Sequence, residues 1–251
     1  MLKILLLLIP LFNIFAIFHN FSISEEEYYD HDKYGYFTRK LIRVKDWKTN
    51  FNNLKNLGPF FMKDIENIKS KPDKELSRGF EGAFSTSLRW PMSKDTDIVP
   101  KEHKPLFEKS YKFIKALKHK NPDQAAYILY EIGDLNAMFT NTHEDIRIFR
   151  YLIKHKKLKD NYQYEHVHKK LKDIYYKIRQ EYLSTINILE HNDIDNNFNK
   201  FMLKFPELHK LVTHLYFNIT KLVIHARNHK TINHKYLDNI YNIDIHTLNT
   251  T

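Results

Sequence analysis

Histidines are numerous in this chain, 15 among 251 residues, and their spacing decides whether any of them can bind a metal ion. His225 and His229 are one helical turn apart in an apolar stretch, which places both rings on one helix face, as a zinc site requires. The residues between them, Ala-Arg-Asn, lack the glutamate of an H-E-x-x-H motif. Because zinc needs at least three protein ligands, this pair alone predicts no metal site, and we expect no metal and no cofactor.

Lysines are the second chemical feature. The chain has 40 Lys and Arg against 30 Asp and Glu, a formal net charge of +10. Six clustered lysines form the predicted anion-binding site: Lys154, Lys156, Lys157, Lys169, Lys170 and Lys172. A cationic face attracts phosphate-bearing surfaces such as lipid headgroups, although an ordinary solvated helix face has the same composition. No nucleic-acid-binding motif accompanies the charge, so the expected partner is an anionic membrane surface and not nucleic acid.

The segment from Gln124 to Thr140 resembles the helix of the zinc-dependent phospholipase C and S1/P1 nuclease group. In that group a Gly-Asp pair follows an apolar helix and the Asp binds zinc. Here the pair is Gly133-Asp134, and only Asp134 carries over. The positions of the other ligands and of the following turn hold different residues: Ala126, Tyr130, Met138 and Thr140. Without those ligands a bound water cannot be activated, so a degenerate hydrolase of this type is kept as an alternative only.

Other catalytic motifs are also missing. The chain has 0 Cys, which excludes thiol catalysis, iron–sulfur clusters and cysteine zinc sites. It contains no G-x-S-x-G sequence, no P-loop and no dinucleotide fingerprint. The sequence therefore predicts a non-enzymatic protein with no catalytic residues.

The elements that must position these residues are predicted to be helices. Gly (5) and Pro (8) are scarce, and apolar residues follow a 3.6-residue period, so we expect an all-α fold, a single-domain irregular multi-helix bundle. The last helix is apolar nearly all round, which is typical of a central bundle helix. His143, Glu144 and Asp145 are expected in a first helical turn behind a Thr142 cap. The expected helices cover residues 24–44, 46–58, 59–71, 76–84, 107–117, 121–135, 142–153, 167–189 and 206–229.

The N-terminus predicts secretion. Lys3 is followed by an apolar run from Ile4 to Phe18, the arrangement of a cleavable signal peptide over residues 1–22, ahead of a helical domain over residues 23–251. A membrane span needs about 20 apolar residues, and this run is shorter. The loop through Trp90-Pro91 is the longest irregular stretch and the expected place for a functional loop.

The chain as a whole resembles the small secreted helical proteins that apicomplexan parasites store in micronemes and gametocyte organelles. The resemblance lies in the signal at Met1–Phe18, the absence of Cys and the Lys- and His-rich helices that extend to Ile224. It implies discharge from secretory vesicles and action at host-derived membranes in gamete egress and cell traversal. A structural cargo protein of the same organelle is the alternative.

Overall fold

The computed structural model describes residues 29–31, 36–38, 45–56, 59–73, 104–159 and 164–245. Contacts divide the chain into two compact units, Met1–Val44 and Lys45–Thr251. The predicted signal peptide, the helix expected over residues 76–84 and the loop through Trp90-Pro91 lie outside the described residues.

The first unit contains two short strands where a helix was expected over residues 24–44. β1 (Tyr29–His31) pairs antiparallel with β2 (Tyr36–Thr38), and Tyr29 lies opposite Thr38. Tyr, Phe and Thr favour strands because their bulky or branched side chains pack well on a pleated surface. The helix prediction is therefore wrong at these residues.

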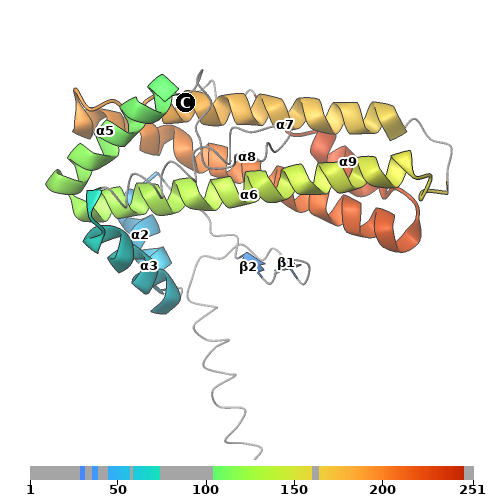
Figure 1. Ribbon diagram of the computed structural model, residues 1–251, viewed down its shortest axis with the longest axis horizontal. Coiled ribbons are helices and arrows are strands. Elements are labelled where there is room, and N and C mark those ends of the chain that lie inside the picture. Colours follow the sequence, from blue (N-terminus) through green and yellow to red (C-terminus); the bar gives the residue numbers. More distant parts are fainter. Residues whose placement is uncertain are drawn as a thin grey trace, which may run out of the picture. The chain divides into compact units, whose positions relative to one another are not determined.

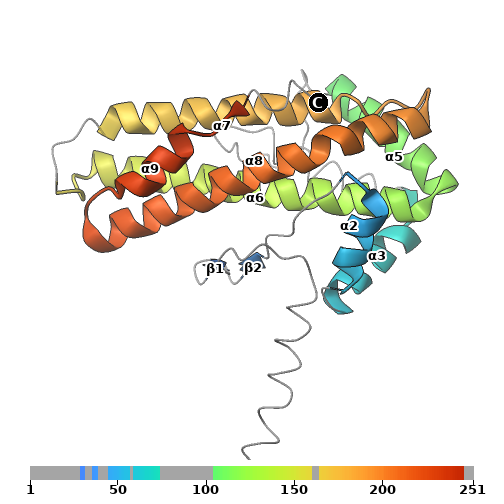
Figure 2. The same cartoon turned by 180° about the vertical axis from the view of Figure 1, so that it is seen from behind.

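The second unit is a multi-helix bundle, which confirms the predicted all-α fold class. α6, α7 and α8 lie side by side, α5, α2 and α3 pack near one end, and α9 packs on α8 near the other (Figures 1 and 2). The helices are α2 (Trp47–Asn56), α3 (Pro59–Ser70), α5 (Lys104–Lys120), α6 (Pro122–Lys154), α7 (Tyr164–Ile186), α8 (Ile194–His229) and α9 (His234–Tyr241).

α8 is the central helix, as its all-round apolar sequence predicted. It packs against α5, α6, α7 and α9, and side chains such as Phe201, Phe205 and Leu215 are completely buried. In the part of the chain that the structure describes, no helix is both long and apolar enough to cross a bilayer.

α6 and α8 run in the same direction. Each of three side-chain contacts between them joins residues that are 75 positions apart in the sequence. A constant offset of this kind defines one parallel register between two helices. The three pairs are Asp134–His209, Met138–Thr213 and Asp145–Thr220.

Two predicted helix starts are wrong. α6 continues through Thr142, because this residue is buried against the core and does not cap a new helix at the surface. α8 begins behind the N-cap Asp193 and passes through Pro206, which was expected to open the helix. Proline inside a helix removes one backbone hydrogen bond, and Pro206 is buried within α8.

Candidate functional site

The six predicted lysines lie at one end of the bundle, where α6 and α8 end and α7 and α9 begin (Figure 1, right). The backbone N–H of Lys159 donates to the carbonyl of Lys230 at 2.7 Å, which joins the connection after α6 to the end of α8. We call this region the basic end. Its members are Lys154, Lys156, Lys157, Lys159, Lys169, Lys170, Lys172, Arg227, Lys230 and Lys235.

The predicted lysines surround this end and do not share one helix face. Lys169 and Lys172 are three residues apart on α7 and lie on the same side. Lys170 points elsewhere, with its Nζ 3.5 Å from the ring centroid of Tyr241 on α9. Of the six, only Lys172 is half-buried, and the other five are exposed.

Sequence reasoning missed part of the basic end. Arg227 and Lys230 at the end of α8, Lys235 in α9 and Lys159 are all exposed. They lie far apart in the sequence, so local clustering of charge could not associate the last helices with α6. In the fold the end of α8 lies near the end of α6, because the two helices are parallel.

Five lysines of the basic end form no ion pair with the described residues. No ion pair within the described part of the chain involves Lys154, Lys156, Lys157, Lys169 or Lys230. Their charges are therefore available to an external anionic group.

Two of these lysines adopt a left-handed backbone. Lys156 has φ 49° and Lys230 has φ 62°, and among the described residues they are the only non-glycine residues with positive φ. Each ends a helix: the Lys156 N–H donates to Ile153 and the Lys230 N–H to Ala226. Glycine is the usual residue here, because an L side chain costs about 1 kcal/mol in this conformation. The chain carries a positive charge at two positions where glycine would be more stable.

A seam of buried polar side chains lies between α6 and its neighbours. The Thr220 hydroxyl donates to the carboxylate of Asp145 at 2.6 Å. Burial lowers the pKa of His143 to about 4, a shift that the nearby Glu144 carboxylate opposes and the Arg147 and Arg179 guanidinium groups reinforce. The prediction that His143 and Asp145 lie in a first helical turn is wrong, since both are buried in the middle of α6.

Three members of the seam form a compact cluster, which we call the buried triad. It consists of Glu131 and Asp134 on α6 and His209 on α8. His209 Nε2 lies 2.9 Å from Asp134 Oδ2 and 4.0 Å from Glu131 Oε2. The side chains of Glu131 and His209 are 0% and 3% exposed, whereas that of Asp134 is 25% exposed.

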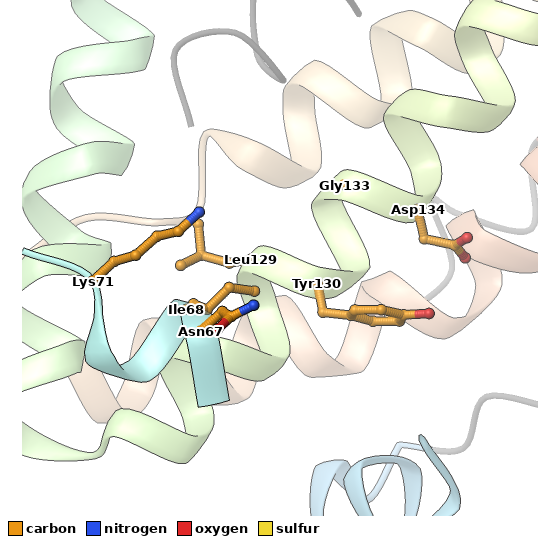
Figure 3. Close-up of a pocket in the computed structure, with 7 residues that line it drawn as sticks. All are labelled: Asn67, Ile68, Lys71, Leu129, Tyr130, Gly133 and Asp134. Carbon is orange, nitrogen blue, oxygen red and sulfur yellow. The ribbon is translucent and has the colours of Figure 1, made fainter. Parts of the chain in front are cut away.

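Asp134 connects the triad to an open groove of about 360 Å³ between α3 and α6. Figure 3 shows Tyr130 and Asp134 projecting from α6 in the same direction, with Lys71 on the opposite side of the view. The groove is lined by Asn67, Ile68, Lys71, Leu129, Tyr130, Gly133 and Asp134.

The residues considered for metal binding are separated in the fold. The rings of His225 and His229 have centroids 4.4 Å apart and are tilted by 32° near the basic end. Burial lowers the pKa of His225, and the charge of His229 lowers it further. Asp134 lies in the triad, and its partner His209 was missed because it comes from a different helix.

No protein-family model, no curated protein and no solved structure matches this chain.

Proposed function

We propose that this chain is a secreted, non-enzymatic helical protein that binds anionic membrane surfaces through its basic end. The observation that carries the proposal is the gathering of exposed basic residues at one end of the bundle, five of which form no ion pair with the described residues: Lys154, Lys156, Lys157, Lys169 and Lys230. The left-handed lysines add support, because strained residues are often retained where they serve a function. A multivalent anion, such as a membrane rich in phosphatidylserine, engages several lysines at once.

The physiological setting follows from the resemblance in composition and N-terminal signal. We propose discharge from a microneme-like secretory organelle and action at host-derived membranes in gamete egress and cell traversal. A structural cargo role without membrane binding is the competing function, and the vesicle experiment below separates the two.

The test compares binding of the full chain to vesicles of phosphatidylcholine alone and to vesicles that also contain phosphatidylserine. Each lysine near an anionic surface contributes about 1 kcal/mol, so three acting together give about a hundredfold in affinity. We expect binding only to the anionic vesicles. It should weaken as salt rises, since the screening length is about 8 Å at physiological ionic strength.

Two matched variants locate the site. Replacing the six predicted lysines with Gln should abolish binding and leave the circular dichroism spectrum unchanged. The control replaces six lysines at the other end of the bundle with Gln and should bind normally: Lys69, Lys109, Lys112, Lys115, Lys118 and Lys120. Equal losses in both variants would mean that net charge alone drives binding. Indifference of the unmodified chain to phosphatidylserine at low salt would favour the cargo role.

A further inference from the structure

We propose that the buried triad is a binding site for one divalent transition-metal ion, with Zn²⁺ as the best match, held by Glu131, Asp134 and His209. This inference goes beyond the proposed function and concerns different residues. No activity is assigned to the ion.

The donor atoms suit zinc in kind and in spacing. Imidazole nitrogen and carboxylate oxygen bind Zn²⁺ at about 2.0–2.2 Å, which separates tetrahedral ligand atoms by about 3.3 Å. In the triad His209 Nε2 is 2.9 Å from Asp134 Oδ2 and 4.0 Å from Glu131 Oε2, and all three ligand atoms lie within 4.8 Å of one another. Side-chain shifts of about 1 Å or less complete the geometry, and pairs of ligands one turn apart facing another helix are how bundles build metal sites.

The hydrogen bonding of His209 gives an independent reason. The Thr213 hydroxyl lies 2.7 Å from the His209 carbonyl and 3.3 Å from Nδ1. Because its single proton is given to the nearer carbonyl, its oxygen accepts from Nδ1–H. Metal-binding histidines are usually oriented in this way by a hydrogen bond at the other ring nitrogen.

That orientation leaves Nε2 facing a carboxylate oxygen at 2.9 Å. Two lone pairs at this distance repel each other unless a positive group lies between them. A proton or a metal ion meets this requirement. A divalent ion bound by two carboxylates and a neutral imidazole forms a unit without net charge, which a mostly buried site favours.

The partial exposure of Asp134 provides access. Its carboxylate lines the groove between α3 and α6, so an ion can enter without unfolding the seam. Three protein ligands with one side open is the pattern of zinc sites that retain a bound water.

Metal titration of the full chain tests the proposal. The protein is stripped with a chelator, and Zn²⁺ binding is measured by calorimetry and by elemental analysis after dialysis. We expect one ion per chain. Glu131→Gln and His209→Gln should each lower the affinity at least about a hundredfold, and Thr213→Val, which removes only the orienting hydroxyl, about tenfold.

Two controls keep the result specific. Asp145→Asn changes a buried carboxylate of the same seam, and the double variant His225→Gln/His229→Gln removes the other candidate histidines; both should bind one ion normally. Absorption of Co²⁺ bound to the unmodified chain gives a readout that does not depend on a variant folding. A proton-bridged triad without metal predicts no stoichiometric zinc and no cobalt band, and either result overturns the proposal. Loss of zinc in the His225/His229 variant alone also overturns it.

Discussion

The two ends of the bundle carry lysines in different states. At one end the lysines are paired with carboxylates: Lys69–Asp123 at 3.0 Å, Lys109–Glu190 at 2.7 Å, Lys115–Asp73 at 3.2 Å, Lys118–Asp73 at 3.6 Å and Lys120–Asp195 at 2.5 Å. We call this the paired end. At the basic end, no ion pair within the described residues involves Lys154, Lys156, Lys157, Lys169 or Lys230. A similar number of lysines therefore gives a nearly balanced surface at one end and an open positive surface at the other.

The direction of α6 and α8 accounts for two of these acids, Asp123 and Asp195. α6 and α8 are parallel, so both of their N-termini lie at the paired end and both C-termini lie at the basic end. Acidic residues favour the positive N-terminal end of a helix dipole, and the first turns hold Asp123 and Asp195. Basic residues favour the C-terminal end, as Lys154 and Arg227 show. The first-turn acids of α6 and α8 therefore pair with lysines at the paired end, and the last turns of both helices hold basic residues at the other.

The largest expected effect comes from unpairing the paired end. We start from the variant with the six predicted lysines replaced by Gln and add Asp73→Asn, Asp123→Asn, Glu190→Gln and Asp195→Asn. Lys115 is the main cause of the lowered pKa of Asp73, and Lys109 is the main cause of the lowered pKa of Glu190. Both carboxylates are therefore charged at neutral pH and neutralise the lysines beside them. Their removal should restore vesicle binding by about a hundredfold, since several lysines are freed together.

A second variant with the same net charge is the control for this gain. It combines the six Gln replacements with Glu165→Gln, Asp173→Asn, Glu181→Gln and Asp238→Asn, which do not mask lysines of the paired end. Weak binding of this control supports a local surface as the determinant. Equal recovery of vesicle binding in both variants would mean that total net charge, and not the pairing of lysines at one end, determines binding.

Lowering the pH would also make both ends of the bundle more positive. We expect the chain to lose stability as the pH falls, because His143 is buried in the folded state. This histidine has a pKa of about 4 in the folded chain because it is buried, against about 6.5 in an unfolded chain. Between these values the unfolded state binds more protons, so stability is complete above pH 6.5 and falls as pH falls toward 4. By pH 5 the free energy of unfolding should drop by about 2 kcal/mol.

Urea unfolding across this pH range checks the effect. His143→Gln cannot titrate at this position and should flatten the curve. The slope that remains reflects His168 and His225, whose pKa values are also lowered, in both cases mainly by burial. His166→Gln, at an exposed position of α7, should leave the curve unchanged. An unmodified chain equally stable at pH 7 and pH 5 would rule out a buried neutral His143. Vesicle assays that compare the ends therefore belong near pH 7.

Sequence reasoning succeeded where a signal was local. The Asn121-Pro122 start of α6 was predicted from its cap and proline, and the Asn121 side chain accepts from the Gln124 N–H. The apolar period of α7 likewise predicted a helix with its buried stripe, including Leu171 and Ile178. α9 was not predicted, because its eight residues bury only Leu237 and Ile240 and show too short a pattern.

The seam and the triad could not be predicted, because polar residues occupy core positions of α6. Glu131, Thr142 and Asp145 are buried, and this hides the apolar face that a periodicity argument needs. On α8, Thr220 contacts Asp145 from 75 residues away and His209 lies near Glu131 from 78 residues away. Without knowledge of the parallel register, the same side chains look like helix caps and surface charges.

The smallest expected effect concerns the left-handed lysines and separates charge from stability at the basic end. Glycine adopts positive φ without steric cost, so Lys156→Gly and Lys230→Gly should each raise the free energy of unfolding by about 0.5–1 kcal/mol. The double variant should also bind anionic vesicles up to about thirtyfold more weakly, since about 1 kcal/mol of attraction is lost for each of the two charges that contacts the surface. Lys157→Gly is the matched control: it removes the neighbouring exposed charge at a residue without positive φ, so binding should fall while stability stays equal or decreases. Denaturant unfolding and vesicle titration of the same samples give both quantities. If the double variant gained stability and kept full affinity, the two lysines would be capping residues only, and the basic end would have to act through its remaining members.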